Sequence, residues 1–349
     1  MYNKPLLNHL RFLFAIRKSG TIVKNNSSRG KKEGSFMPNN QSKQLAQGAM
    51  LGAIFAVLIA IGYYVPILSI VVLAIAPLPI AFYSASFERS QAILMTIVSI
   101  GITFFLGGLL ILPSAILFGI AGLVIGDAIR LKKSKLYLLI STSISLLITL
   151  SLMYVASLKL LEVDVIKDSF ELMRESYMQG IEMSEKLTGQ VVMTKEQLNE
   201  AFNMLNTIIP ASITISVVLL ALTLISINLP LLKRFKIDVP KFSKFKSMRL
   251  PKAVLWYYLI VLVITIFVNP EVGTPLYVII LNFSLVLWVL LTLQGLSFIY
   301  FLIDEKNLPK FLKVLAAFFS VPFYSFVLLI GVLDLGFDLR KFITAKKDN

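Results

Sequence analysis

The chain has no cysteine and a single histidine, His9, among its 349 residues. Without cysteine it can form no disulfide, thiolate nucleophile or thiolate metal site. Because His9 lies near the N-terminus, the rest of the chain also lacks the usual general base near neutral pH and the commonest metal ligand. The His-Glu-x-x-His helix of metalloproteases, a membrane Ser–His pair and a Gly-rich phosphate loop are missing too. We therefore expect a protein that is not an enzyme and that holds no cofactor or metal.

Charged residues are also scarce, at 15% of the chain against 57% hydrophobic residues. A membrane span needs about 20 mostly apolar residues to cross a hydrocarbon core of about 30 Å. The composition and nine long apolar stretches of the sequence predict an all-α polytopic transmembrane helical bundle. The candidate spans are Gln47–Tyr64, Pro66–Tyr83, Gln91–Leu112, Ser114–Ile129, Leu136–Leu158, Thr207–Leu232, Ala253–Val268, Pro275–Ile303 and Phe311–Leu333.

Residues 1–36 differ from the rest, because they are polar and carry eight basic residues and one acid. Lys32-Glu33-Gly34 can be encoded by a purine run like those that bacterial ribosomes bind, just before Met37. We expect residues 1–36 to be a leader and Met37 to be the native start; the alternative is a disordered basic tail attracted to anionic lipid. Without this segment the net charge falls from +15 to +8, and His9 is lost.

The basic residues predict an orientation, since Lys and Arg concentrate in short cytoplasmic loops. The 130–135 turn and the 233–252 loop are strongly basic, whereas residues 159–206 carry a net charge of −4. This distribution predicts a six-span core over residues 37–232 in a bacterial plasma membrane. Its N-terminus and basic loops would be cytoplasmic, its acidic loop extracytoplasmic. Residues 253–349 would form two or three further membrane segments and a basic tail.

The last third fits this orientation less well. Three further spans would place Arg340 and Lys341 outside, against the distribution of basic residues. Either one of the last segments is re-entrant or lies on the surface, which leaves eight spans, or the tail is an exception to the rule. We favour eight.

Small residues line one face of the first span, and such faces let helix backbones approach closely in lipid. This face packs either against other helices of the same chain or against a separate membrane partner, and the sequence leaves both alternatives open. A similar face on the fourth span is expected to pack inside the bundle. The first face consists of Ala49, Ala53, Ala56 and Ala60, and the second of Ala115, Gly119, Gly122 and Gly126.

Few polar side chains fall within the spans. Asp127 ends the fourth span one helical turn before Arg130, which favours a solvated boundary ion pair over an intramembrane functional acid. Asn282 and Gln294 can bridge helices or contact a ligand, and structural bridging is favoured. Asp334 lies at a span boundary.

The acidic 159–206 loop has its own pattern. An apolar stripe at helical spacing predicts an amphipathic helix that ends near Gly189. Thr194 and Gln197 form a capping box that opens a second helix leading into the sixth span. We expect a helical hairpin over the outer mouth of the bundle, with Phe170, Met173 and Tyr177 as lid or ligand contacts; a solvated acidic spacer is the alternative. The full stripe is Ile166, Phe170, Met173, Tyr177 and Ile181.

Four stretches resemble the YybS-like family, bacterial membrane proteins of unknown function found in Bacillus relatives. They comprise residues 44–56, 76–80, 118–130 and 331–340.

The first six spans also resemble, more distantly, the substrate-binding S-components of energy-coupling-factor vitamin importers. In those proteins an Ala-x-x-x-Ala face on the first helix docks a transmembrane coupling subunit, and Ala49/Ala53 and Ala56/Ala60 match that face. The resemblance implies a small-molecule binding subunit that works with a coupling subunit and ATPases, and it identifies no substrate. The alternative is a non-transporting scaffold or regulator of envelope or spore processes. We expect the lipid bilayer as a partner and no nucleic acid.

Overall fold

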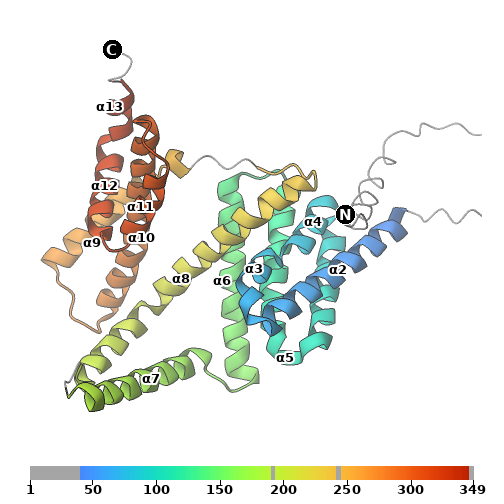
Figure 1. The fold of residues 1–349 in the computed structure, drawn as a ribbon, viewed down its shortest axis with the longest axis horizontal. Helices are drawn as coiled ribbons and strands as arrows, with labels where there is room; N and C mark the ends of the chain where they lie inside the picture. Colours follow the sequence, from blue (N-terminus) through green and yellow to red (C-terminus); the bar gives the residue numbers. More distant parts are fainter. Residues whose placement is uncertain (1–39, 190–192, 241–244, 346–349) are drawn as a thin grey trace, which may run out of the picture. The chain divides into compact units, whose positions relative to one another are not determined.

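The computed structural model describes residues 40–189, 193–240 and 245–345, so the expected leader at residues 1–36 lies outside the described residues. The chain divides into two units, residues 1–43 and 44–349, and the arrangement below is that of the second. Within the described residues all regular structure is helical (Figure 1). This confirms the all-α prediction.

The first two predicted spans form a tight helical pair. Helix α2 (Asn40–Tyr64) is followed, after one residue, by α3 (Pro66–Ile75) and α4 (Leu78–Ser86). The second span is broken between α3 and α4, where Pro77 and Pro79 supply no backbone N–H to continue the ladder. Together α3 and α4 make one interrupted candidate span of 21 residues.

Helix α5 (Arg89–Arg130) contains two spans, because the chain reverses within it. Gly108 has φ 63° and ψ −148°, a conformation open almost only to glycine. Beyond it, Gly119 packs against side chains of the first arm. Each arm is about 20 residues, or about 30 Å long. Two helical arms thus stand where the sequence predicts the third and fourth spans, but it placed their boundary near Pro113, which instead lies inside the second arm.

Three helices complete the core and its outer hairpin: α6 (Lys135–Leu160), α7 (Val165–Thr188) and α8 (Lys195–Arg234). Helix α7 ends at Gly189 in the left-handed conformation, and the Thr194–Gln197 capping box opens α8. Both features confirm the sequence predictions. At 40 residues α8 is about 60 Å long, twice the hydrocarbon thickness, so its first part extends beyond the span.

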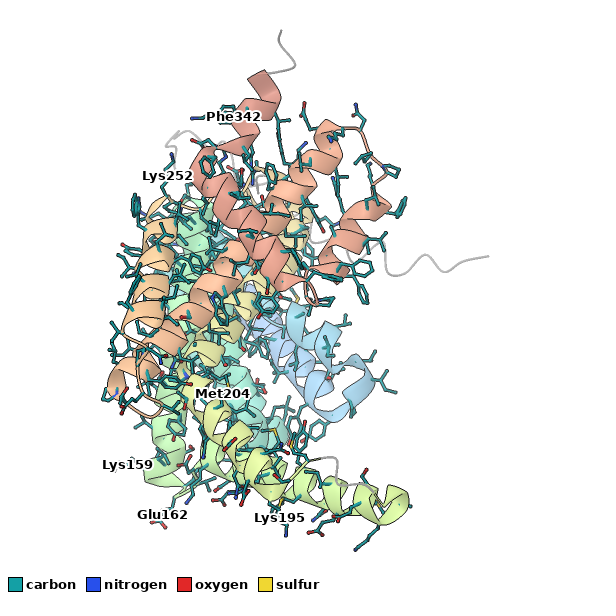
Figure 2. All side chains as sticks on the ribbon, turned by 90° about the vertical axis from the view of Figure 1, so that its left-hand side faces the viewer. Lys159, Glu162, Lys195, Met204, Lys252 and Phe342 are labelled. Atoms are coloured by element: carbon teal, nitrogen blue, oxygen red, sulfur yellow. The ribbon has the colours of Figure 1, made fainter. Side chains whose placement is uncertain are left out.

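Contacts between helix ends show the directions in which successive helices of the core run. Gln44 bonds to Gln91 at 3.1 Å at one end of the core. The Tyr64 hydroxyl donates to the carbonyl of Leu106 at the other end, beside the Gly108 turn. The helices from α2 to the first arm of α5 therefore run alternately between these two ends, and the six-span core stays a prediction. Figure 2 shows Lys159, Glu162 and Lys195 at one end of the unit and Lys252 at the opposite end.

The C-terminal helices form a second layer beside α8. Helix α10 is long enough to span, whereas α9, with 15 residues and about 23 Å, is shorter than the seventh predicted span. Helices α11 and α12 meet at an angle of 109°. The elements are η2 (Phe245–Ser247), α9 (Ala253–Phe267), α10 (Pro275–Glu305), α11 (Phe311–Phe319), α12 (Tyr324–Phe337) and α13 (Leu339–Ala345).

Ion pairs show where the bent α11–α12 pair begins and ends. Lys313 at the start of α11 pairs with Asp304, which also contacts Lys246 of the basic loop at 3.0 Å. Asp338, just after α12, pairs with Arg249 of the same loop at 3.2 Å. Both ends of the pair therefore lie beside the basic loop, as the predicted re-entrant segment requires.

The number of spans depends on how two bent elements are treated. Among the described residues six helices are long and apolar enough to cross a membrane, or seven if α11 and α12 count as one span. That number counts α5 once, although its two arms are each long enough to cross. The favoured eight spans would require α5 to count as two, the short α9 to cross and α11–α12 to be re-entrant, so the eight-span arrangement stays a prediction.

Close backbone packing holds α4 against the second arm of α5. A Cβ added at Gly122 would lie 2.6 Å from the carbonyl oxygen of Pro77. A Cβ added at Gly126 would overlap the carbonyl oxygen of Ala81. The fourth-span small face therefore packs inside the bundle, as predicted.

Candidate functional site

A groove between α6, α7 and α8 is wide enough to hold a small molecule. Its volume is about 540 Å³. Ten of its lining residues are apolar, three are serines and none is charged. The lining consists of Leu150 on α6, of Val165, Ile166, Ser169, Phe170 and Met173 on α7, and of Leu205, Ile208, Ile209, Ser212, Ile213, Ser216 and Val217 on α8.

The apolar stripe of α7 faces α8, as the helical hairpin predicts. Phe170 and Met173 line the groove. Tyr177 does not, but its ring packs edge-on against buried Phe202 at 6.1 Å, as the ring of Phe170 does at 6.2 Å. All three stripe residues thus lie on the α8 side of α7, although Tyr177 remains 58% exposed.

Polar contacts hold α7 at both ends. The Asp164 carboxylate accepts hydrogen bonds from the backbone N–H of Lys167 at 3.0 Å and from the hydroxyl of Tyr154 at 3.2 Å. Near the other end Glu182 pairs with Lys195 at 4.0 Å. Helix α7 is therefore a positioned element against α8, not a spacer without tertiary contacts.

The serine hydroxyls that line the groove differ from nearby threonine hydroxyls in their hydrogen bonding. Thr207 and Thr214 on α8 donate to carbonyls of their own helix at 2.9 and 2.8 Å. Within the described part of the chain, no hydrogen bond joins the hydroxyls of Ser169, Ser212 or Ser216 to another residue. These three hydroxyls are available to a ligand.

Asn282 of α10 bridges helices, which was the favoured alternative. Its Oδ1 accepts from the backbone N–H of Ala211, and its Nδ2 donates to the carbonyls of Thr207 and Val278. The amide therefore faces the α8 backbone beside Pro210 and does not line the groove. A ligand-contact role for Asn282 is not supported.

The first-span alanines divide into an exposed and a packed half. Ala49 and Ala53 are exposed, whereas Ala56 is fully buried and Ala60 packs against the core. Ala56 is thus in contact within this chain and cannot meet a separate partner. The docking prediction remains for Ala49 and Ala53 only.

Asp127 and Arg130 form the predicted boundary ion pair. Arg89, at the start of α5, also approaches Asp127 at 3.8 Å. The Asp127 side chain is 16% exposed and that of Arg130 29%, so the pair is less solvated than expected. It ties the two ends of α5 together and borders a polar cavity of about 260 Å³ that Gln91 also lines.

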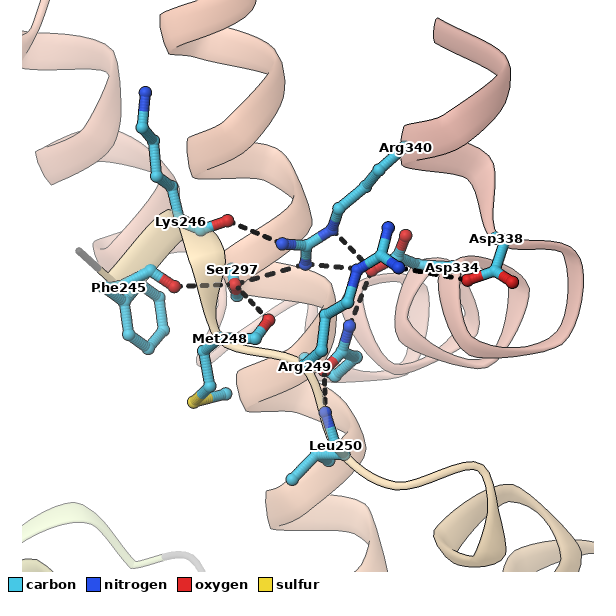
Figure 3. A network of polar contacts seen from close by, with 10 residues as sticks. Phe245, Lys246, Met248, Arg249, Leu250, Ser297, Asp334, Asp338 and Arg340 are labelled. Atoms are coloured by element: carbon cyan, nitrogen blue, oxygen red, sulfur yellow. Dashed lines mark hydrogen bonds and ion pairs between the residues drawn. The ribbon is translucent and has the colours of Figure 1, made fainter. Parts of the chain in front are cut away.

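A buried polar network in the C-terminal helices was missed by the sequence analysis (Figure 3). Asp334 on α12 and Arg340 on α13 are 3% and 5% exposed and pair at 2.9 Å. The Gln294 amide also donates to Asp334 at 2.6 Å. The sequence placed Asp334 at a boundary and Arg340 in an exposed tail. The available signal was an acid and an arginine six residues apart, with a glutamine in the preceding span.

The same network anchors the basic loop. Arg340 donates to the carbonyl of Lys246 at 2.6 Å, and the Ser297 hydroxyl lies within hydrogen-bond distance of the carbonyls of Phe245 and Met248. Gln294 Oε1 accepts from the backbone N–H of Leu250 at 2.9 Å. The loop is therefore attached to α10 through its main chain.

Comparison with known proteins identifies the family. Residues 53–335 match the family described as "Predicted membrane protein (DUF2232)". The chain belongs to this family. "Uncharacterized protein YybS" of Bacillus subtilis (strain 168) is 29% identical over 304 residues, which cover 85% of this chain and 97% of the relative. The expected YybS-like resemblance is confirmed. No solved structure matches the chain significantly.

The DUF2232 match includes most of the features described above. It spans the groove, the Asp127–Arg130 pair, Asn282 and Asp334, whereas Arg340 lies just beyond it. Neither the description of the family nor the name of the Bacillus relative states a ligand.

Proposed function

We propose that this protein is a membrane-embedded binding subunit, without catalytic function of its own, that captures a small and mainly apolar molecule in the groove between α6, α7 and α8. The observation that carries the proposal is the groove itself. Its volume of about 540 Å³ falls in the range of about 300–1,000 Å³ typical of small-molecule sites. Such sites are mostly apolar with a few placed polar groups, as here.

The distribution of basic residues supports an orientation for this capture. The turn after Arg130 and the loop after α8 are basic and lie at the end opposite the α7 hairpin. If that end is cytoplasmic, the groove opens toward the outer side of a bacterial plasma membrane. The N-terminus is then cytoplasmic, and the molecule is taken up from the outer leaflet or from outside the cell.

Mass spectrometry of the protein released gently from native membranes tests capture. We expect a stoichiometric small molecule on the wild type. Ile209→Trp, which fills the groove, should lose it, whereas Val218→Trp, on the exposed side of the same helix, should keep it. If the wild type and both variants carry only the same bulk lipids, capture is wrong and the scaffold alternative gains support.

A second role, as the docking subunit of an importer, is favoured by the exposed half of the first-span face. Ala49 and Ala53 lie one helical turn apart and leave room for a close approach by another membrane helix. The partner would be a transmembrane coupling subunit with its ATPases. Ala53→Phe should abolish co-purification of that subunit, whereas Ile54→Phe on a neighbouring exposed position should not. Failure of the wild type to retain any coupling subunit would refute docking and leave capture untouched.

A further inference from the structure

We infer that the ligand of this groove is an uncharged single-chain amphiphile, an apolar chain with one neutral hydrogen-bonding head, which enters sideways from the bilayer. The inference rests on the proposed function and specifies the ligand class of the same site.

The shape of the groove suits one extended chain. Its lining on α8 runs from Leu205 to Val217, and twelve residues of helix cover about 18 Å. Across from it α7 contributes only its first turns, from Val165 to Met173. The lining therefore extends further along α8 than along α7, as an extended chain lying along α8 requires.

The electrostatics of the groove exclude a charged head. No lining residue is ionisable, and burying an ion without a partner costs far more than burying a hydrogen-bonding group. On α7, Lys167 and Glu171 are exposed and are paired with each other at 3.8 Å. A carboxylate or phosphate in the groove would meet no charged lining residue.

The serines provide the polar recognition. Ser212 and Ser216 lie one turn apart on α8, with Ser169 contributed by α7. Each hydroxyl can both donate and accept, and none is used by another described residue. They fit a hydroxyl, ester or amide group, which offers matching donors and acceptors without a charge.

The sides of the groove are open at the level of the apolar helices. Ser216 is exposed, and Leu205 is 39% exposed at the groove edge. The adjoining surface carries exposed Leu152 and Val155 on α6 and Leu219 on α8, as expected for a lipid-facing surface. An amphiphile can therefore move from the hydrocarbon into the groove without crossing water.

A matched series of probes with one oleoyl chain tests the ligand class. The full-length protein in nanodiscs is titrated with 1-monooleoylglycerol, oleate and 1-oleoyl-lysophosphatidylglycerol, and bound adducts are counted by native mass spectrometry. We expect monooleoylglycerol to bind at least tenfold more tightly than either anion. The double variant Ser212→Ala/Ser216→Ala should lose most of that preference, whereas Thr214→Val, whose hydroxyl bonds to its own helix, should keep it.

The outcomes separate the two proposals. Equal binding of the three probes, or a preference for an anionic one, that Ile209→Trp abolishes would overturn the neutral ligand class and leave capture intact. Binding of every probe that is unchanged by Ile209→Trp would refute the groove as a site, and with it the proposed function. A preference for monooleoylglycerol that survives the double serine variant would overturn recognition by the hydroxyls.

Discussion

Asn282 Oδ1 accepts a hydrogen bond from the backbone N–H of Ala211 at 2.9 Å. The Nδ2 of the same side chain donates to the carbonyl of Thr207 at 2.7 Å. In an α-helix the N–H of Ala211 and the carbonyl of Thr207 are ordinary partners, since they lie four residues apart. The amide therefore inserts a side-chain bridge into the α8 ladder beside Pro210, and so joins α10 to the helix that lines the groove.

Asn282→Leu should weaken the contact between α10 and α8. The change removes the partner of two backbone groups and should cost about 1–3 kcal/mol in the free energy of unfolding. Thermal unfolding in detergent measures the effect, with Phe283→Leu, a change on the exposed neighbouring position, as control. Equal stability of the two variants would show that the bridge does not stabilise the contact between α8 and α10.

Gly108→Ala should destabilise the core. At φ 63° and ψ −148° an alanine is strained by about 1–3 kcal/mol, although no atom lies within 4 Å of the added Cβ. Gly101→Ala is the matched control, because its Cβ also meets nothing but its backbone is helical. Removing a helical glycine should stabilise by up to about 1 kcal/mol. Opposite shifts in melting temperature are expected, and shifts of the same sign would contradict the reversal at Gly108.

The Asp334–Arg340 pair should behave as a coupled unit. Asp334→Leu or Arg340→Met alone leaves a buried charge without its main partner and should cost about 3–5 kcal/mol. The double variant removes both charges and should cost less than the sum of the two. A double-mutant cycle on unfolding in detergent measures the coupling, and additive effects would show that the two charges do not interact.

Cysteine labelling can test the topology, because the chain has no cysteine of its own. A membrane-impermeant thiol reagent applied to whole cells should label Glu182→Cys on α7 and Glu271→Cys between α9 and α10. It should leave Lys132→Cys and Lys341→Cys unlabelled until the cells are opened. Labelling of Lys341→Cys in intact cells would mean that α11 and α12 cross the membrane instead of returning.

The contribution of Asp338 to the stability of the protein should decrease at acidic pH. Burial opposes ionisation of this carboxyl, but the charges of Lys341, Lys252 and Arg249 outweigh it, so the pKa of Asp338 is lowered. A lowered pKa in the folded state stabilises the protein above the unfolded value of about 3.9 and ceases to do so as the pH falls through the folded value. The stability difference between wild type and Asp338→Asn should thus be constant from pH 7 to 5 and shrink below pH 4. A difference that already declines between pH 7 and 5 would implicate another group.

Local signals predicted the helices well. The spacing of apolar residues in α7, the capping box at Thr194 and the prolines between α3 and α4 each act within a few residues, so they can be recognised in the chain alone. The sequence analysis placed the chain reversal near Pro113 instead of at Gly108, because proline interrupts helices more strongly than glycine. A glycine in an apolar helix acquires a positive φ only through the packing of the two arms.

The polar sites were harder to predict, because their meaning depends on distant partners. Asp334 and Arg340 look like boundary and tail charges until α13 folds back and Gln294 approaches from α10. The groove depends on three helices whose lining residues span positions 150 to 217. Asn282 was correctly favoured as a bridge, but its position opposite Pro210 follows only from the packing of α10 on α8.

The contacts of Arg340 have a consequence for the order of assembly. Its partner Asp334 lies six residues away in the sequence, whereas the carbonyl of Lys246 lies 94 residues away. The ion pair can therefore form within the last two helices alone, whereas the contact with Lys246 closes a long loop and requires α10 and α12 to have packed first. Occupation of the Lys246 carbonyl by Arg340 thus reports that the C-terminal helices have assembled.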